Sequence, residues 1–230
     1  MYKSVIDFIQ NTFGTTEFIP LHEPRFVGNE KKYVADAIDS TFVSSVGAYV
    51  NRFEEDFASV TEQPYAVATV NGTAALHIAM LLVDVAKDTE VLTQALTFVA
   101  TCNAISYLGA IPHFVDVDRK SMGICPDKLK QYLSEIAEMR NGTCFNKNTG
   151  KRISACVPMH TFGHIGKIEE VVEVCNTYNI PVVEDAAEAL GSYKNGKHAG
   201  SFGTVAAFSF NGNKIITAGG GGAITTNNET

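Results

Sequence analysis

Three short segments carry side chains that could do chemistry, and each follows a run of residues typical of a buried strand. The first is Asn71-Gly72-Thr73, directly after residues 65–70. A glycine here allows close backbone approach, and the free N–H groups of a new helix form an anion site to which the Thr73 hydroxyl could add. Asn71 and Thr73 could equally do no more than cap the helix.

The second segment is Glu184-Asp185-Ala186-Ala187-Glu188, at the end of residues 181–184. Asp185 has apolar neighbours, and such a carboxylate could hold a cationic ring nitrogen, bind a metal ion or act as a base. A capping aspartate with solvated glutamates is an equal alternative. A metal site made by Glu184, Asp185 and Glu188 is a further one.

The third segment carries a lysine, Lys214, after the strand-like residues 206–210 and a turn rich in Asn and Gly. Residues Ile215 and Ile216 follow it. A lysine held among apolar groups has a lowered pKa and can form Schiff bases as the free amine. The alternative is a turn lysine in solvent.

Two other patterns in the sequence are weaker. Residues 191–198 nearly match a phosphate-binding P-loop, but His198 replaces the hydroxyl residue, and Asn195-Gly196 predicts a type I′ hairpin turn instead. His160 lies in a segment interrupted by proline and glycine, which argues against a metal-binding helix. We expect His160 in a loop, where it could face a substrate.

Short β-branched runs alternate with amphipathic segments along most of the chain. Strands are expected at 65–70, 90–93, 113–117, 153–157 and 181–184, and helices at 72–83, 98–108, 127–139 and 165–178. This alternation predicts an α/β fold with a mostly parallel sheet and helices on both faces. Ligands of such sheets bind at the carboxyl ends of the strands, where all three segments lie.

The remaining residues define the expected domain organisation. An N-terminal helix and extended arm occupy 1–30, including an extended stretch at 14–28, and one large domain occupies 31–230. Two further helices are expected around 29–42 and 51–61, an exposed loop at 140–151, and a strand at 222–226.

Composition excludes several classes of partner. With 45% apolar and 19% charged residues, the 230-residue chain can form a sizeable core, and its net charge of −7 argues against nucleic acid or an anionic membrane as partner. Its five cysteines form no C-x-x-C pair, which predicts buried thiols in a reducing compartment and no metal site. No apolar run is long enough to span a membrane, so we expect a cytoplasmic protein.

A phosphate cradle, an acidic partner and a reactive lysine, in this order, fit one cofactor. Pyridoxal 5′-phosphate needs a lysine for its Schiff base and an aspartate opposite its pyridinium nitrogen. Each of the three signals is weak alone. The ordered combination is much more specific.

The chain resembles the DegT/StrS family, which are pyridoxal phosphate-dependent fold-type I aminotransferases that act on nucleotide-linked keto sugars. The matching stretches lie at 71–77, 96–105, 112–118, 158–164, 183–191 and 209–214. The resemblance is in particular to the branch that aminates carbon 4 of 4-keto-6-deoxy sugars, of the bacillosamine and legionaminic acid type. It implies the fold-type I large domain, without the smaller C-terminal domain that family members have.

The resemblance also implies residue roles. Lys214 would be the catalytic lysine, bound to the cofactor and moving the proton of the amino acid. Asp185 would keep the pyridinium nitrogen protonated, Glu188 would lie near the phenolic oxygen or beside Asp185, and Phe98 would stack on the ring. The cofactor phosphate would be held by three residues: Gly72, Thr73 and Ser209. His160 is the candidate for substrate contact.

The implied reaction takes an amino group from glutamate to a nucleotide-linked keto sugar, for surface polysaccharide or glycan biosynthesis, in a homodimer with its site at the interface. Two alternatives stay open. Related dehydratases replace the lysine by histidine, which Lys214 argues against. A truncated, non-catalytic module that binds the cofactor or a nucleotide is the other.

Overall fold

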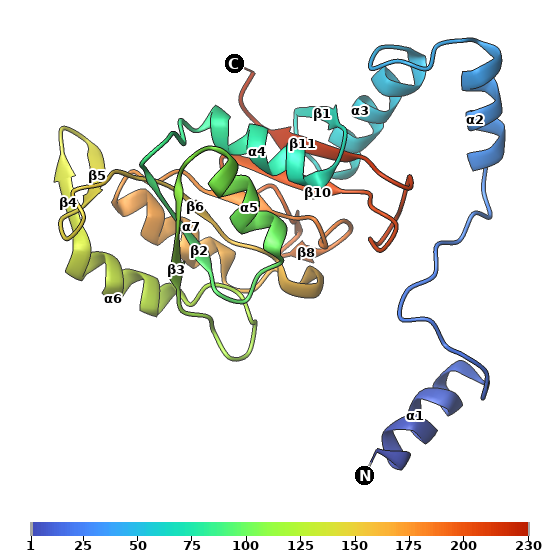
Figure 1. Ribbon diagram of the computed structural model, residues 1–230, viewed down its shortest axis with the longest axis horizontal. Coiled ribbons are helices and arrows are strands. Elements are labelled where there is room, and N and C mark those ends of the chain that lie inside the picture. Colours follow the sequence, from blue (N-terminus) through green and yellow to red (C-terminus); the bar gives the residue numbers. More distant parts are fainter. Residues whose placement is uncertain (1, 230) are drawn as a thin grey trace.

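A four-stranded and a three-stranded sheet form the centre of the computed structural model, which describes residues 2–229 (Figure 1). Isolated bridges pair Cys156 with Val182 and Met159 with Asp185, which joins the two sheets into one layer. The strand order across this layer is β1 (Tyr65–Thr69), β11 (Gly222–Thr226), β10 (Val205–Ser209), β7 (Val183–Asp185), β6 (Ile153–Val157), β2 (Glu90–Gln94) and β3 (Ile111–Val115).

The strands of this layer are parallel with one exception. β10 is parallel to β7, and β2 is parallel to both β3 and β6. β11 runs antiparallel to both of its neighbours, β1 and β10. The predicted α/β class with a mostly parallel sheet is therefore confirmed, and the strand expected at 222–226 is the antiparallel one.

Helices cover both faces of the sheet because alternate side chains of each strand point to opposite sides. In β10, Val205 and Ala207 belong to one apolar cluster, whereas Ala206 and Phe208 belong to the other. The first cluster includes buried residues of two helices, α4 (Gly72–Leu82) and α5 (Val99–Tyr107). The second includes buried residues of three others, α3 (Ala48–Val60), α6 (Pro126–Ile136) and α7 (Ile168–Thr177).

The structure differs from the expected elements around residue 140. The helix expected at 127–139 ends at Ile136, and a hairpin of β4 (Ala137–Arg140) and β5 (Thr143–Asn146) replaces the first part of the loop expected at 140–151. Its turn residues, Asn141 and Gly142, have φ of 50° and 81°. Asn-Gly pairs favour this left-handed geometry in two-residue hairpins. Met139 is consequently an exposed strand residue.

A second hairpin confirms the sequence argument against a P-loop. β8 (Tyr193–Lys194) pairs with β9 (Lys197–His198), and Asn195 and Gly196 have φ of 53° and 79°. The cysteines follow the prediction in part. Cys144, Cys156 and Cys175 are buried free thiols, whereas Cys102 and Cys125 are partly exposed.

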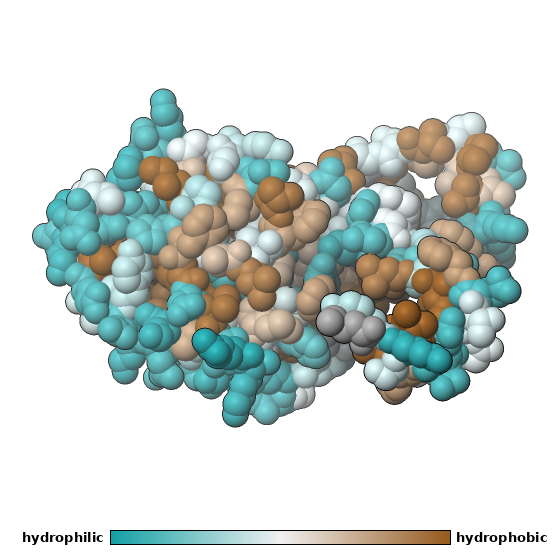
Figure 2. Space-filling view, turned by 60° about the horizontal axis from the view of Figure 1, so that its bottom comes forward, coloured by the Kyte–Doolittle hydropathy of each residue, from teal (hydrophilic) through white to brown (hydrophobic). Residues whose placement is uncertain are grey.

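The N-terminal segment projects from the body of the molecule (Figure 1). α1 (Lys3–Phe13) is joined by the expected extended arm to α2 (Glu30–Asp39), and neither helix has a buried residue. Apolar side chains of this segment, Phe8, Phe13, Phe18 and Leu21 among them, are exposed, and Figure 2 shows apolar side chains at its surface. The proposed division at residue 30 remains a prediction.

Candidate active site

A cavity of about 320 Å³ opens where β1, β7 and β10 end. All residues expected to bind a cofactor line it: Gly72, Thr73, Phe98, Asp185, Glu188, Ser209 and Lys214. The carboxyl ends of these parallel strands meet at one edge of the sheet, so segments more than 100 residues apart come together there. The seven residues predicted from the sequence therefore lie together in the structure, and their individual roles stay predictions.

The N-terminus of α4 forms one wall of this cavity. The Asn71 side chain accepts a hydrogen bond of 2.8 Å from the backbone N–H of Ala74, so Asn71 is the helix cap. Gly72 and Thr73 occupy the first turn, whose N–H groups have no intrahelical partner. A Cβ on Gly72 would lie 2.6 Å from Cβ of Ser209. Only glycine therefore lets the end of β10 approach the start of this helix.

Asp185 forms the floor of the cavity at the end of β7. The residue is 3% exposed, and its carboxylate accepts hydrogen bonds from the Thr101 hydroxyl (2.7 Å) and the Ala187 N–H (3.3 Å). Burial raises the pKa of Asp185, while these donors and the charge of Lys214 act in the opposite direction. A buried acceptor beside an open cavity suits a cationic group of a ligand.

Lys214 reaches the cavity from the turn after β10. Its Nζ lies 3.3 Å from Oε1 of Glu188 and 5.7 Å from the centre of the Phe98 ring, and its side chain is 10% exposed. Ile215 and Ile216, which follow the lysine in the sequence, are more than half exposed. The apolar neighbour of the lysine is therefore Phe98.

Glu188 connects the lysine to a neighbouring loop. Its second oxygen, Oε2, accepts a hydrogen bond of 3.1 Å from the N–H of Phe162, which has a left-handed φ of 52°. The next residue, Gly163, packs so closely that a Cβ there would lie 2.8 Å from the Glu188 carbonyl oxygen. Glu188 thus contacts Lys214 and this loop together.

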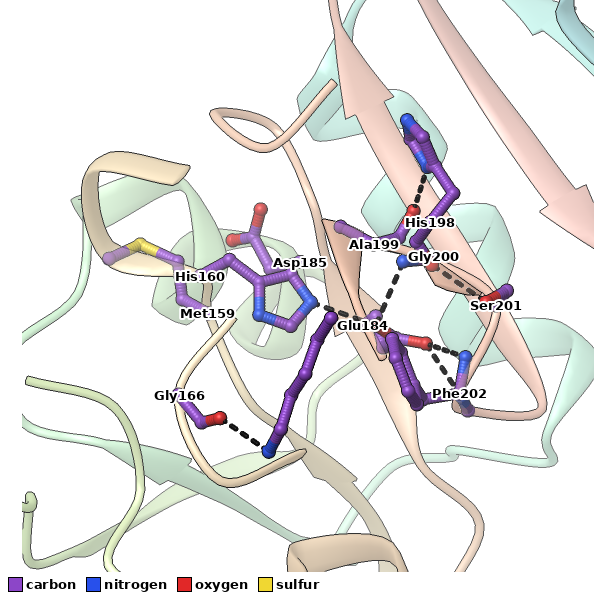
Figure 3. Close-up of polar contacts among 12 residues, drawn as sticks. Met159, His160, Gly166, Glu184, Asp185, His198, Ala199, Gly200, Ser201 and Phe202 are labelled. Carbon is purple, nitrogen blue, oxygen red and sulfur yellow. Dashed lines mark hydrogen bonds and ion pairs between the residues drawn. The ribbon is translucent and has the colours of Figure 1, made fainter. Parts of the chain in front are cut away.

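His160 does not line the cavity, and its expected contact with a substrate remains a prediction. The residue lies in a loop, as expected, but it is 2% exposed, and its Nε2 lies 2.8 Å from Oε2 of Glu184 (Figure 3). Met159, the preceding residue, lines the cavity instead. Burial within the loop could not be read from the local pattern of prolines and glycines.

The three clustered carboxylates have separate partners. Glu184 bonds His160, Asp185 bonds Thr101, and Glu188 bonds Lys214. Among residues 2–229 no group of three or more His, Cys, Asp or Glu side chains is arranged to hold a metal ion. The sequence analysis did not identify Thr101, which bonds Asp185, or Met159, which lines the cavity. No local sequence pattern shows which residue of a helix or loop will contact the end of a distant strand.

Sheet order and site together define the large domain of an aminotransferase fold. The chain aligns with the X-ray structure of the aminotransferase from Psychrobacter cryohalolentis at a TM-score of 0.79 and 30% identity, over 93% of this chain and 50% of that one. A structure of DesI in the presence of its TDP-sugar product aligns at a TM-score of 0.77 and 28% identity, over 95% and 53%.

The chain belongs to the DegT/DnrJ/EryC1/StrS aminotransferase family, whose model matches residues 24–230. It is 38% identical to a GDP-perosamine synthase of Escherichia coli O157:H7, over 93% of this chain and 54% of that protein. It is 39% identical to the putative pyridoxal phosphate-dependent aminotransferase EpsN of Bacillus subtilis (strain 168), over 92% and 52%. The chain therefore spans about half the length of the curated relatives it matches.

Within residues 2–229, no helix combines the length and the apolar character needed to cross a membrane.

Proposed function

We propose that this chain is the cofactor-binding domain of a pyridoxal phosphate-dependent aminotransferase that transfers an amino group from glutamate to the 4-keto carbon of a nucleotide-linked 4-keto-6-deoxy sugar. One observation carries the proposal: a lysine amine, a buried aspartate and a helix N-terminus line the same cavity. When bound, pyridoxal phosphate would supply an electrophilic carbon for amines and a ring that withdraws electrons from them.

The phosphate would lie against the start of α4. The first-turn N–H groups of Gly72 and Thr73 point along the helix axis, where the helix dipole favours an anion. The hydroxyl groups of Thr73 and Ser209 would add two donors. The close approach of Gly72 to Ser209 supports this role, since it brings the start of α4 and the end of β10 together at the expected phosphate site.

The ring would lie between Phe98 and the floor of the cavity. Phe98 is 60% exposed, so an apolar ring placed against it would remove both surfaces from water. The Asp185 carboxylate would accept a hydrogen bond from the ring nitrogen and keep it protonated. The unfavourable burial of the Asp185 carboxylate would then be offset by a cationic partner in direct contact with it. Among the described residues, the positive charges that act on Asp185 belong to more distant groups.

Lys214 would be the catalytic residue. Its amine is the group that would attack the cofactor and later move a proton at the α-carbon of the amino acid. A protonated amine cannot attack, so the ammonium must first release a proton. Glu188, whose Oε1 is 3.3 Å from Nζ, is placed to accept it.

The substrate class rests on the relatives. GDP-perosamine synthases and the DesI structure with a TDP-sugar support a nucleotide sugar, and no feature of the cavity selects the nucleotide. Assembly as a homodimer in the cytoplasm is part of the proposal. The exposed apolar side chains of the N-terminal segment support an association with a second chain.

A visible absorption spectrum with added pyridoxal phosphate tests this function first. A band that disappears on borohydride reduction, followed by peptide mapping of the label to Lys214, is the expected result. Glutamate together with a 4-keto-6-deoxy nucleotide sugar should then give the amino sugar. A label on Lys214 without transamination would favour the non-catalytic binding module, and absence of any label from the folded protein would contradict the proposal.

A further inference from the structure

Glu184 is a fully buried carboxylate that accepts four hydrogen bonds. Its Oε2 accepts hydrogen bonds from Nε2 of His160 (2.8 Å) and from the N–H of Gly200 (2.9 Å). Its Oε1 accepts one from the N–H of Phe202 (2.7 Å) (Figure 3). Oε1 accepts a second from the N–H of Gly203 (2.6 Å). Although burial opposes its ionisation, His160 and the backbone donors keep the pKa of Glu184 below its ordinary value.

The loop that supplies three of these donors is shaped around the carboxylate. Gly200 has φ of +89°, and a Cβ there would lie 2.6 Å from the Phe208 ring. A Cβ on Gly203 would lie 2.6 Å from the carbonyl oxygen of Val182. Both glycines are therefore required for the loop to bring its N–H groups this close to Glu184.

His160 links this carboxylate to the candidate active site. An ionised carboxylate only accepts hydrogen bonds, so Nε2 of His160 must carry a proton. The backbone N–H of His160 donates to the carbonyl oxygen of Asp185 (3.1 Å), and the N–H of Asp185 donates to that of Pro158 (2.9 Å). The segment 158–160 is thus paired with the end of β7.

Met159, in the middle of that segment, lines the cavity. Its Sδ lies 3.4 Å from the backbone nitrogen of Phe98 and 3.4 Å from Oγ1 of Thr97, and its N–H donates to Oε1 of Gln94 (3.2 Å). A contact chain therefore runs from Glu184 through His160 and Met159 to Phe98. It reaches both the floor and one wall of the cavity.

We infer that Glu184 is a positioning residue that acts through His160, fixing a proton on Nε2 and holding the segment 158–160 so that Asp185 and Phe98 keep their places in the cavity. The part of the inference that concerns cofactor binding rests on the proposed function. The part that concerns His160 does not.

The first test uses cofactor-free protein labelled with ¹⁵N-histidine. The Glu184→Gln variant removes the charge, His160→Gln assigns the resonances, and Glu169→Gln is a matched control at an exposed carboxylate of α7. In the wild type and in E169Q, the ring shifts of His160 should report a proton on Nε2 at neutral pH. In E184Q this proton should redistribute toward Nδ1. Unchanged shifts in E184Q would overturn the inference.

The second test measures the dissociation constant for pyridoxal phosphate. E184Q and H160Q should each weaken binding about tenfold, as expected for loss of one buried hydrogen bond, and the double variant should be no weaker than H160Q alone. Losses that multiply in the double variant would contradict an action through His160.

If E184Q fails to fold, the H160Q variant alone tests the inference. Glu184 keeps its three backbone donors in H160Q, and the inference still requires a tenfold weaker binding of pyridoxal phosphate. If the wild type itself binds no pyridoxal phosphate, the proposed function fails, and the ring shifts still decide the role of Glu184.

Discussion

Glu188 lies between Lys214 and the left-handed residue Phe162, with one carboxylate oxygen for each. Oε1 is 3.3 Å from Nζ of Lys214, and Oε2 accepts the backbone N–H of Phe162 at 3.1 Å. The side chain of Lys214 is largely buried, so this contact is less screened than a surface ion pair. The position of the lysine is therefore coupled to the loop at 161–163.

The Glu188→Gln variant separates these two contacts. Glutamine can still accept the Phe162 N–H, but it cannot take a proton from the lysine ammonium. We expect the rate constant for loading with pyridoxal phosphate to fall about fivefold, equivalent to about 1 kcal/mol, while thermal stability changes little. Stopped-flow absorbance measures that rate. An unchanged rate constant would show that Glu188 serves only the loop.

The Lys214→Arg variant tests the chemistry of the lysine while keeping its charge. Arginine can still pair with Glu188, but it remains protonated and is no nucleophile. We expect a folded protein that acquires no borohydride-stable label from pyridoxal phosphate. Lys128→Arg, at an exposed position of α6, is the matched control and should label like the wild type. Labelling of K214R at wild-type levels would move the reactive amine elsewhere.

The Gly72→Ala variant tests the close approach of α4 to β10. A new Cβ would lie 2.6 Å from Cβ of Ser209, so we expect a loss of about 1–3 kcal/mol in the free energy of unfolding and weaker phosphate binding. Gly123→Ala is the control, because its Cβ would meet only Oγ of Ser121, at 3.9 Å. Urea denaturation of both variants measures the difference. Equal stability of G72A and wild type would mean that the strand end can move aside.

Burial of Asp185 predicts a pH-dependent stability. Because its pKa is raised in the folded protein, the ionised group destabilises the cofactor-free fold at neutral pH, and this penalty disappears as the pH falls below the unfolded pKa of about 4. Asp185→Asn should therefore stabilise the cofactor-free protein by about 1 kcal/mol near neutral pH and by less near pH 4, while weakening cofactor binding.

Urea unfolding at the two pH values measures this effect. Glu55→Gln, at an exposed carboxylate of α3, should show no comparable difference. A variant D185N that is less stable than the wild type at neutral pH would mean that the hydrogen bonds from Thr101 and Ala187 outweigh desolvation.

The order of elements and the cavity residues could be predicted because both depend on local patterns. Helix faces follow a 3.6-residue period, as in α6, where Leu129, Leu133 and Ile136 are buried on one face. The glycine at 72 and the aspartate at 185 follow strand-like runs directly. The topology of a parallel sheet then brings such strand ends together, so the residues of the site could be predicted without knowing any side-chain contact.

The missed features depend on partners far away in the sequence. The expected loop at 140–151 contains an Asn-Gly turn, and that local signal was available for a hairpin. No local signal was available for the role of Glu184, because its donors come from His160 and from residues 200–203. Only the folded chain brings these residues together. The exposure of Ile215 and Ile216 likewise depends on how their turn leaves β10.

The antiparallel strand β11 also constrains the order of events during synthesis. Lys214 lies in the connection between β10 and β11, and β11 is the only strand that contacts both β10 and β1 within the described sheet. Until residues 222–226 leave the ribosome, β1 has no paired strand in the described sheet, and the connection that carries the lysine is anchored only at its β10 end. The pairing of β1 with β11 spans about the whole domain, so it is among the slowest contacts to form. The lysine should therefore take its place after the rest of the cavity wall is folded.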